Sequence, residues 1–429
     1  MRIFSLAALM VLSLIAGCET LPPVNEEIAR ATRDADAPHR LALLRREGEK
    51  VTGVAFTPGN SVQLLRDGAA AVPAITAAIN GAKSSIDMES YVFDEKDGLG
   101  IADLLIARCA QGVAVNLIYD AWGSLHTPHE VIDRLRASGV NVIEFNPIDP
   151  KSIIGNRVDY RDHRKILVVD GKLAITGGVN ISGVYLRDNS HPGAAHDPEH
   201  DAWRDTDIRV EGPAVAEYER SFMQTWTEHR GPVLPSRPLP VNDAKGDLPV
   251  QVIANTPAHK EHDIYSALLV AITLAQKSVH LTTGFFVPTH DLRRALHEAA
   301  LRGVDVRVLV PRNSTSDSAV AAGRAYYEDL LEDGVHVFEY PENRVLHAKT
   351  AVIDSEWSTV GSSNLDWRSV ILNNELTTVI LSPAFGAQLE AMFQADTTLA
   401  QEIDPQAWAR RPFGARFREW RARLFEYFL

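Results

Sequence analysis

The sequence of 429 residues predicts an α/β fold made of two similar α/β halves. Segments with helical periodicity alternate with short Gly turns and buried apolar runs, which is typical of helices packed on a sheet. The same series of segments comes before and after a proline-rich stretch, which indicates an internal duplication. With 45 % hydrophobic residues, the chain is long enough for two domains of about 200 residues each.

The first residues, MRIFSLAALMVLSLIAGC, read as a targeting segment. Arg2 supplies a positive charge, residues 3–15 are apolar, and small residues precede Cys18. A membrane span needs about 20 apolar residues, so this run is too short. It resembles a bacterial lipoprotein box, so we expect residues 1–17 to be a lipoprotein signal peptide and Cys18 to carry lipid. A plain signal peptide or an uncleaved anchor is the alternative.

This segment also predicts where the protein resides. A lipidated Cys18 implies a periplasm-facing lipoprotein in the cell envelope of a bacterium. Glu19 allows an outer-membrane destination in a Gram-negative host, and the inner membrane stays open. The other cysteine, Cys109, reads as a small core residue of a helix, so no internal disulfide is expected. We expect residues 18–55 to be a tether between the anchor and the folded body.

Residues 56–230 and 250–400 form the two predicted halves, and the proline-rich residues 231–249 form the linker between them. Three pairs of segments match across the halves, each a helix end followed by a strand: 79–93 with 272–286, 108–120 with 300–311, and 134–147 with 329–342.

A short motif also occurs twice, as DHRKILVVD and LHAKTAVID. Its members are His163, Lys165 and Asp170, then His347, Lys349 and Asp354. Read as strands, the two copies place each His and Lys on one face, at the accessible end of a strand buried on both sides. Each Asp lies at the far end of the strand, so we interpret Asp170 and Asp354 as turn or structural residues.

Further polar residues follow each motif at matching places. Asn180 and Asn364 come after a glycine turn, and Asp205 and Glu375 come later. A neutral His can act as a nucleophile when a carboxylate fixes its tautomer. Lys and Asn side chains can hold phosphate oxygens without a metal. A second His can protonate the leaving group on the opposite side of the phosphorus. The set therefore predicts phosphodiester chemistry that needs no cofactor and no metal.

Two copies of H-x-K-x4-D, each followed by G-[GS]-x-N, resemble the phospholipase D superfamily over residues 60–395. Within it, LLRDGAAAVPAITAAINGAKSSIDMESYVF and WSTVGSSNLDWRS resemble the cardiolipin synthase branch. The resemblance implies two halves related by a pseudo-twofold axis and one shared active site. It assigns His163 as the nucleophile that becomes phosphatidyl-histidine and His347 as the acid and base, although the two could be exchanged. Asp205 and Glu375 would orient them.

The resemblance implies a phosphatidyltransferase that makes cardiolipin from phosphatidylglycerol, with phosphatidylethanolamine as another donor. A phospholipase D that releases phosphatidic acid is the alternative. A nuclease is disfavoured by the formal net charge of −13, because nucleic acid calls for a basic face. An inactive scaffold is disfavoured by two intact motifs. The acceptor alcohol and the oligomeric state are not predicted.

Two further segments allow more than one interpretation. Residues 188–201 carry His191, His196 and His200 among carboxylates, and we expect a solvated loop, with a metal site or a rim of the active site as alternatives. Residues 401–429 form a basic amphipathic helix with aromatic residues at helical spacing. It can contact a membrane surface or dock against the body. The aromatic and aliphatic positions are Phe413, Phe417, Trp420, Leu424 and Tyr427.

Overall fold

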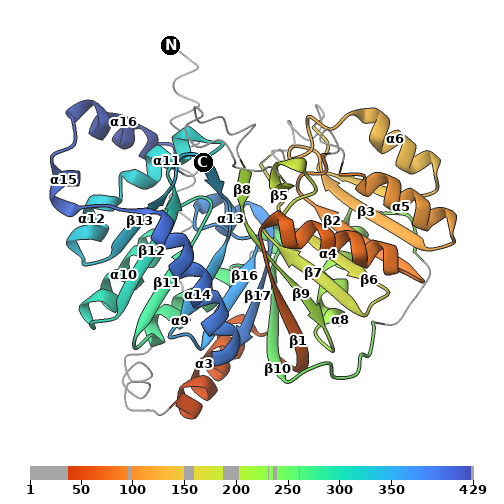
Figure 1. The fold of residues 1–429 in the computed structure, drawn as a ribbon, viewed down its shortest axis with the longest axis horizontal. Helices are drawn as coiled ribbons and strands as arrows, with labels where there is room; N and C mark the ends of the chain where they lie inside the picture. The colour runs from red at the N-terminus through yellow and green to blue at the C-terminus, as the bar shows by residue number, and fades with distance from the viewer. Residues whose placement is uncertain are drawn as a thin grey trace.

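The computed structural model describes residues 37–94, 99–148, 159–186, 202–229, 231–234, 239–259 and 261–426. The predicted signal peptide, Cys18 and the His-rich segment 188–201 lie outside these ranges. The described part forms an α/β fold around one large sheet (Figure 1). This confirms the predicted fold class.

The first half supplies seven strands to one side of the sheet. In spatial order they are β4 (Asn141–Phe145), β3 (Ala114–Asp120), β2 (Ser85–Ser90), β6 (Ile166–Val169), β7 (Leu173–Gly177), β9 (Thr206–Glu211) and β1 (Thr57–Arg66). β2, β3 and β4 run parallel to one another, whereas β6 and β7 are antiparallel to their neighbours.

The second half continues the sheet in the mirrored order. Its strands are β10 (Leu248–Asn255), β17 (Asn373–Leu381), β16 (Trp357–Gly361), β15 (Thr350–Ile353), β11 (Ser278–Thr282), β12 (Asp305–Pro311) and β13 (His336–Tyr340), with β18 (Gln401–Glu402) at the edge. β1 and β10 pair antiparallel at the centre. Apart from β18, each of these strands thus has its counterpart in the other half, as a pseudo-twofold axis between β1 and β10 requires.

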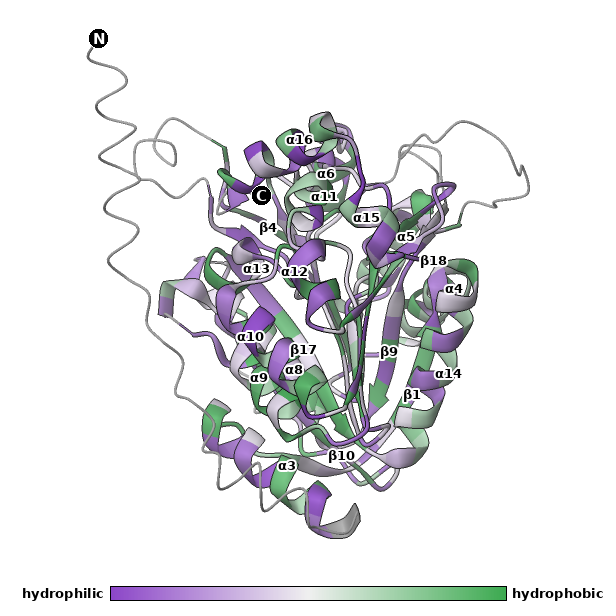
Figure 2. Ribbon diagram, turned by 90° about the vertical axis from the view of Figure 1, so that its left-hand side faces the viewer, coloured by the Kyte–Doolittle hydropathy of each residue, from purple (hydrophilic) through white to green (hydrophobic). Residues whose placement is uncertain are grey.

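The helices obey the same symmetry. α4 (Asp67–Gly81) and α14 (Pro383–Leu399) lie on one face of the sheet, and α8 (Val215–Glu228), α9 (Asp263–Leu274) and α10 (His290–Leu301) lie on the other (Figure 2). α4 and α9 are counterparts, since each follows the first strand of its half. Their opposite placement is what a twofold axis in the plane of the sheet produces. α5 (Ile101–Ala110) and α6 (His129–Ala137) complete the first half.

Apolar cores fill the space between the sheet and each helical layer. One lies under α4 and α5 in the first half, and a larger one lies under α9 and α10 in the second. A third contains residues of both halves, including Val168, Ile208, Val250 and Ile380, between α8 and α14. Burial of such side chains stabilises each fold by about 1.5–3 kcal/mol per residue. Because the third core is shared, the two halves are held together rigidly.

The predicted tether of residues 18–55 is wrong for its last part. α3 (Ala37–Thr52) packs against α9, and its Leu44 is buried in the second-half core together with Phe56. The Arg40 guanidinium pairs with Glu356 at 2.6 Å. The polar composition suggested a tether because most of the helix surface faces solvent, while a few apolar side chains suffice to dock it.

The carboxyl-terminal residues form α15 (Pro405–Ala409) and α16 (Phe413–Arg423), and α16 packs against α11 (Asp317–Arg324). Docking against the body, one of the two interpretations of this segment, is therefore observed. Tyr427 lies outside the described residues. Among the helices that the structure describes, none combines the length and the apolar character needed to cross a membrane.

Candidate active site

Both His-Lys elements lie where the chain changes its strand partner. β5 (Arg161–Asp162) pairs with the start of β17, whereas β6 pairs with β2 and β7. His163 and Lys165 occupy the interval between the two strands. The prediction of one continuous strand through HRKILVVD is therefore wrong at its first three residues. Both side chains are also buried rather than accessible, with exposed fractions of 6 % and 4 %.

The second element repeats this geometry with exchanged partners. β14 (Arg344–Leu346) pairs with β8 (Ala202–Arg204), the short strand just before β9 of the first half. The backbone amide of His347 donates to the carbonyl of Arg204 at 2.8 Å, and that of His163 donates to the carbonyl of Asn374 at 2.9 Å. Each His is therefore fixed by backbone pairing next to a carboxylate of the other half.

The two carboxylates bind the histidines crosswise. His163 Nδ1 lies 3.0 Å from Glu375 Oε1, and His347 Nδ1 lies 2.6 Å from Asp205 Oδ2. A carboxylate only accepts hydrogen bonds, so Nδ1 of each imidazole donates and Nε2 keeps its lone pair. The sequence placed a His and a carboxylate in each half, but not the exchange between halves.

The lysines stand beside their own histidines. Lys165 Nζ donates to the carbonyl of His163 at 2.6 Å, and Lys349 Nζ donates to the carbonyl of His347. Both ammonium groups are buried, and Lys165 lies 5.2 Å from the centre of the Tyr91 ring. Two cations and two imidazoles therefore converge where the halves meet.

The two asparagines differ in their contacts. Asn180 Oδ1 accepts from the amide of Val92 at 3.0 Å, and its Nδ2 donates to the Tyr185 hydroxyl at 3.1 Å. The buried Oδ1 of Asn364 has no hydrogen-bond partner within the described residues. A Cβ built on Gly284 would come within 3.1 Å of Lys349 Nζ and 3.3 Å of Asn364 Oδ1, so these two side chains border the same glycine.

Asp170 and Asp354 lie at the opposite ends of β6 and β15, both with φ of 54°. The Asp170 carboxylate accepts from the amides of Lys83, Ser84 and Ser85 at 2.6–3.0 Å. The Asp354 carboxylate accepts in the same way from residues 276–278 at 2.7–2.9 Å. Each therefore closes the turn that precedes β2 or β11, away from the histidines.

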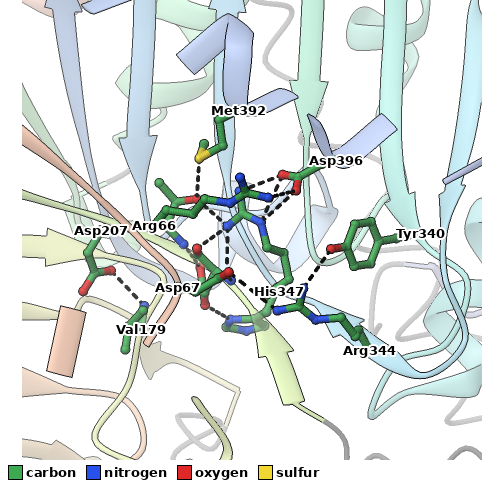
Figure 3. A network of polar contacts seen from close by, with 12 residues as sticks. Arg66, Asp67, Val179, Asp207, Tyr340, Arg344, His347, Met392 and Asp396 are labelled. Carbon is green, nitrogen blue, oxygen red and sulfur yellow. Dashed lines mark hydrogen bonds and ion pairs between the residues drawn. The ribbon is translucent and has the colours of Figure 1, made fainter. Parts of the chain in front are cut away.

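A buried ionic network supports the Asp205 side (Figure 3). The Arg204 guanidinium binds Asp396 at 2.7 Å, and the backbone amide of Asp205 donates to Asp67 Oδ1 at 3.1 Å. Asp67 adopts a φ of 61°, a left-handed conformation tolerated by a short polar side chain. The network ties α4 and α14, one from each half, to the link between β8 and β9 that carries Asp205.

Burial and the two lysines control the charge of the site. Burial lowers the pKa of His163 to about 4 despite Glu375, and burial together with Lys349 lowers that of His347 to about 3. Burial likewise lowers the pKa of Lys165 to about 7 and that of Lys349 to about 8, although nearby carboxylates oppose the shift. Before substrate binds, the histidines are therefore neutral at neutral pH.

Sequence reasoning missed three aromatic residues around the histidines. The Tyr91 ring meets His163 edge to face at 4.9 Å, and the Trp203 ring lies 4.9 Å from His347. The Tyr185 hydroxyl lies 3.4 Å from His347 Nδ1. In the aligned repeat, Tyr91 occupies the position of Gly284. This large difference between otherwise similar segments is the signal by which the sequence could have identified Tyr91. Nothing in the sequence marks Tyr185 or Trp203.

The arrangement can hold a phosphodiester between two Nε2 atoms with cations beside it. A neutral imidazole can attack phosphorus, and a second can exchange protons with the leaving and entering oxygens. The duplicated α/β halves with this combined site define the chain as a phospholipase D-type enzyme.

Comparison with known proteins identifies the family. The model described as "Cardiolipin synthase, PLD-like domain" matches residues 75–226 and 268–397, and the chain belongs to this family as a phospholipase D-superfamily phosphatidyltransferase. It is 34 % identical over 397 residues to a cardiolipin synthase of Geobacillus kaustophilus, covering 90 % of this chain and 76 % of the relative. With cardiolipin synthase A of Pseudomonas aeruginosa it shares 35 % over 360 residues, covering 83 % and 71 %.

Among solved structures, phosphatidylserine synthase of Haemophilus influenzae matches with a TM-score of 0.64 and 15 % sequence identity. The match covers 90 % of this chain and all of that one. At this identity the likeness concerns the fold alone.

Proposed function

We propose that the protein transfers a phosphatidyl group from one phospholipid to the hydroxyl of phosphatidylglycerol and so makes cardiolipin. The observation that carries the proposal is the crossed pair of His–carboxylate contacts, with a lysine beside each His. Two equivalent bases on opposite sides of a phosphodiester suit a double displacement, in which each displacement needs a nucleophile and an acid.

In the first step Nε2 of His163 attacks phosphorus while His347 donates a proton to the departing headgroup oxygen. In the second step His347 takes the proton of the entering alcohol, whose oxygen displaces His163. Lys165, Lys349 and the amides of Asn180 and Asn364 surround the phosphate oxygens, and Glu375 and Asp205 stabilise the imidazolium forms. Asp170 and Asp354 act structurally, through the turns that they close.

The acid role requires a protonated His347, whereas burial and then Lys349 lower its pKa and keep it neutral before substrate binds. An arriving phosphodiester brings a negative charge that offsets the lysines and raises the pKa of His347. Substrate binding is therefore coupled to uptake of a proton.

The test is to reconstitute the purified protein in vesicles of phosphatidylglycerol, with and without phosphatidylethanolamine, and to analyse the lipids by mass spectrometry. Cardiolipin and free glycerol are expected from phosphatidylglycerol alone. Phosphatidic acid without cardiolipin supports the alternative of a hydrolase, in which water replaces the acceptor. The same preparation carrying His163→Ala serves as the control for contaminating activity.

The proposal includes residence in the cell envelope of a bacterium, as a periplasm-facing lipoprotein anchored through lipid on Cys18. A lipid chain can hold an enzyme at a bilayer without a membrane span. Cys18→Ser should then move the protein from the membrane fraction toward the soluble fraction. If the variant stays fully bound, a protein surface such as the carboxyl-terminal helix holds it instead.

A further inference from the structure

α16 is an amphipathic helix whose apolar side chains face outward and whose most buried side chain is charged. Its most buried side chain is Glu419, at 6 % exposure, whereas Phe413, Phe417 and Trp420 are 81 %, 50 % and 54 % exposed. The three rings stack in sequence, with centroids 6.3 Å and 5.8 Å apart. Leu424 and Phe425 extend this exposed stripe. A helix of a soluble body normally turns its apolar stripe inward, so an outward stripe indicates a contact with something else.

Polar contacts fix the helix in this orientation. Arg411 binds Glu328 at 3.1 Å and Glu419 at 3.0 Å underneath the helix. The Arg423 guanidinium lies 4.6 Å from the centre of the Tyr326 ring. The aromatic stripe therefore does not result from a loosely placed helix, because ionic and cation–π contacts fix α16 on the body. The stripe borders a hollow that these charged side chains also line.

The first half presents large apolar side chains at the same end of the molecule. Trp122, Leu125, Tyr160 and Leu186 are 53 %, 56 %, 38 % and 49 % exposed. Trp122 lies 5.9 Å from the Arg161 guanidinium, two residues before His163, and Tyr160 directly precedes that arginine. Leu186 follows Tyr185, which contacts His347. Trp122, Tyr160 and Leu186 thus adjoin residues at the active site on the side of the first half, and Leu125 lies beside Trp122.

α16 belongs to this end because of its neighbour α11. The backbone of α11 at Gly323 touches the carbonyl of Phe286, two residues after Gly284 beside Lys349. Figure 1 shows α11, α16, β5 and β8 at one end of the molecule. Exposed aromatic residues therefore flank the active site from both halves.

The charge at this end identifies the partner. Residues 410–426 contain six arginines and two glutamates in a chain of net charge −13. Arg410, Arg418 and Arg421 are exposed and form no ion pair within the described residues. Interfacial aromatic residues beside arginines suit a bilayer with anionic headgroups, where each arginine strengthens binding about fivefold.

We propose that this end, with Trp122, Leu125, Tyr160 and Leu186 on one half and the stripe of α16 on the other, is a docking face for anionic bilayers. It sets the active site against the lipid surface, and in that respect it rests on the proposed function. A lipid on Cys18 keeps the protein near the membrane, whereas this face determines which way the body is turned.

The two exposed tryptophans, one on each half, allow a direct test. Trp122 and Trp420 are exposed, and the other five are half-buried or buried. The full-length protein is placed in phosphatidylglycerol/phosphatidylcholine vesicles whose acyl chains carry bromine, which quenches tryptophan fluorescence on contact. Trp122→Phe and Trp420→Phe should each lose part of the quenching, and the double variant should lose more than half. Phenylalanine keeps the face apolar, so these variants report on contact without abolishing it.

A matched pair of variants tests whether the aromatic stripe contributes to binding of the bilayer. Phe417→Ser should reduce the quenching of Trp420 by severalfold, whereas Leu301→Ser should leave it unchanged. Leu301 is 71 % exposed but ends α10 just before β12 begins, at the opposite end of the sheet. Arg418→Gln with Arg421→Gln should weaken the dependence on phosphatidylglycerol.

Unchanged quenching in the double tryptophan variant overturns the proposal, as does quenching of Trp420 without Trp122. A dimer in lipid-free solution that Phe417→Ser converts to monomer, with no quenching in vesicles, makes a second copy the occupant and also overturns it. Lipid products are measured in the same vesicles. Cardiolipin without quenching refutes the docking face alone, and quenching without any phosphatidyl transfer refutes the proposed function alone.

Discussion

The two halves of the molecule agree in every group to which we assign a role at the phosphate and differ in what surrounds these groups. Each half contributes a His, a Lys and an Asn, and a carboxylate for the His of the other half. The Tyr91 ring lies beside His163, whereas the aligned Gly284 has no side chain and packs closely against His347 and Lys349. Tyr185 and Trp203 cover His347 from the first half instead. The duplicated groups therefore define the chemistry, and the unduplicated ones give each His its own surroundings.

Replacing one His at a time should separate their roles with the largest effect. We expect His163→Ala to abolish turnover and covalent labelling by the phosphatidyl group. His347→Ala should slow phospholipid turnover by about 10²- to 10⁴-fold, the usual contribution of a general acid. A p-nitrophenyl leaving group needs no acid, so His347→Ala should recover much of its rate on that substrate, measured by absorbance. Labelling of His347 in the His163→Ala protein contradicts this order of roles.

Substitution of the carboxylates tests whether each one binds the His of the other half. Glu375→Gln and Asp205→Asn should each reduce kcat by about 10²- to 10⁴-fold, because the imidazole loses its fixed tautomer and the stabilisation of its cation. In nitrogen NMR spectra, Glu375→Gln should disturb His163 and leave His347 unaffected, and Asp205→Asn should do the reverse. Pairing within each half predicts the opposite assignment.

The lysines set the pH dependence. The acid limb of kcat/KM should report His163, whose pKa is about 4, because it must be neutral to attack. Above this limb kcat/KM should decline as pH rises, because substrate binding takes up a proton on His347, and it should decline more steeply above pH 7 to 8, as Lys165 and then Lys349 lose their charge. Lys349→Met should weaken substrate binding roughly tenfold and raise the pKa of His347, since after burial this ammonium is the strongest influence that lowers it. An unchanged His347 titration in NMR spectra argues against this coupling.

A smaller effect should come from Asp207, which accepts from the amide of Val179 at 3.0 Å. Burial, and then Asp205, raise its pKa to about 8. The folded state therefore holds a proton that the unfolded chain releases near pH 4, and stability falls as pH rises between these values. Asp207→Asn keeps the acceptor without the charge, so it should raise Tm by a few degrees at pH 8 and hardly change it at pH 4. Equal shifts at both pH values point to a packing effect instead.

The fold and the reactive groups can be predicted from the sequence because both produce local sequence patterns. Alternating helices and strands, their repetition, and His-x-Lys twice are all visible without a structure. The sequence predicts that Asp205 and Glu375 are the site carboxylates, but not which His each one binds. That assignment depends on the pairing of β5 with β17 and of β8 with β14. β5, β8 and β14 are only two or three residues long, so they show no hydrophobic periodicity.

Two predictions are wrong for a similar reason: the tether at residues 37–55 and the continuous strand through His163. The docking of α3 depends on a few apolar residues in a polar sequence, of which Leu44 is buried. The break in the strand at residues 163–165 depends on a change of hydrogen-bond partner, which the residue types do not announce. Burial of the two lysines likewise follows from the meeting of two halves that no local pattern describes.

The crossed contacts also bear on how such a chain can change over generations. If the two halves were separate identical copies, any substitution near one His would appear beside the other as well. Joining them in one chain removes that constraint, so that a tyrosine can stand at residue 91 where the other half keeps Gly284. Yet neither half can drift freely, because Asp205 and Glu375 each serve the neighbour. The surroundings of the two histidines can therefore diverge and come to suit the donor and the acceptor lipid separately. The two halves must nevertheless evolve together, because each His depends on a carboxylate of the other half.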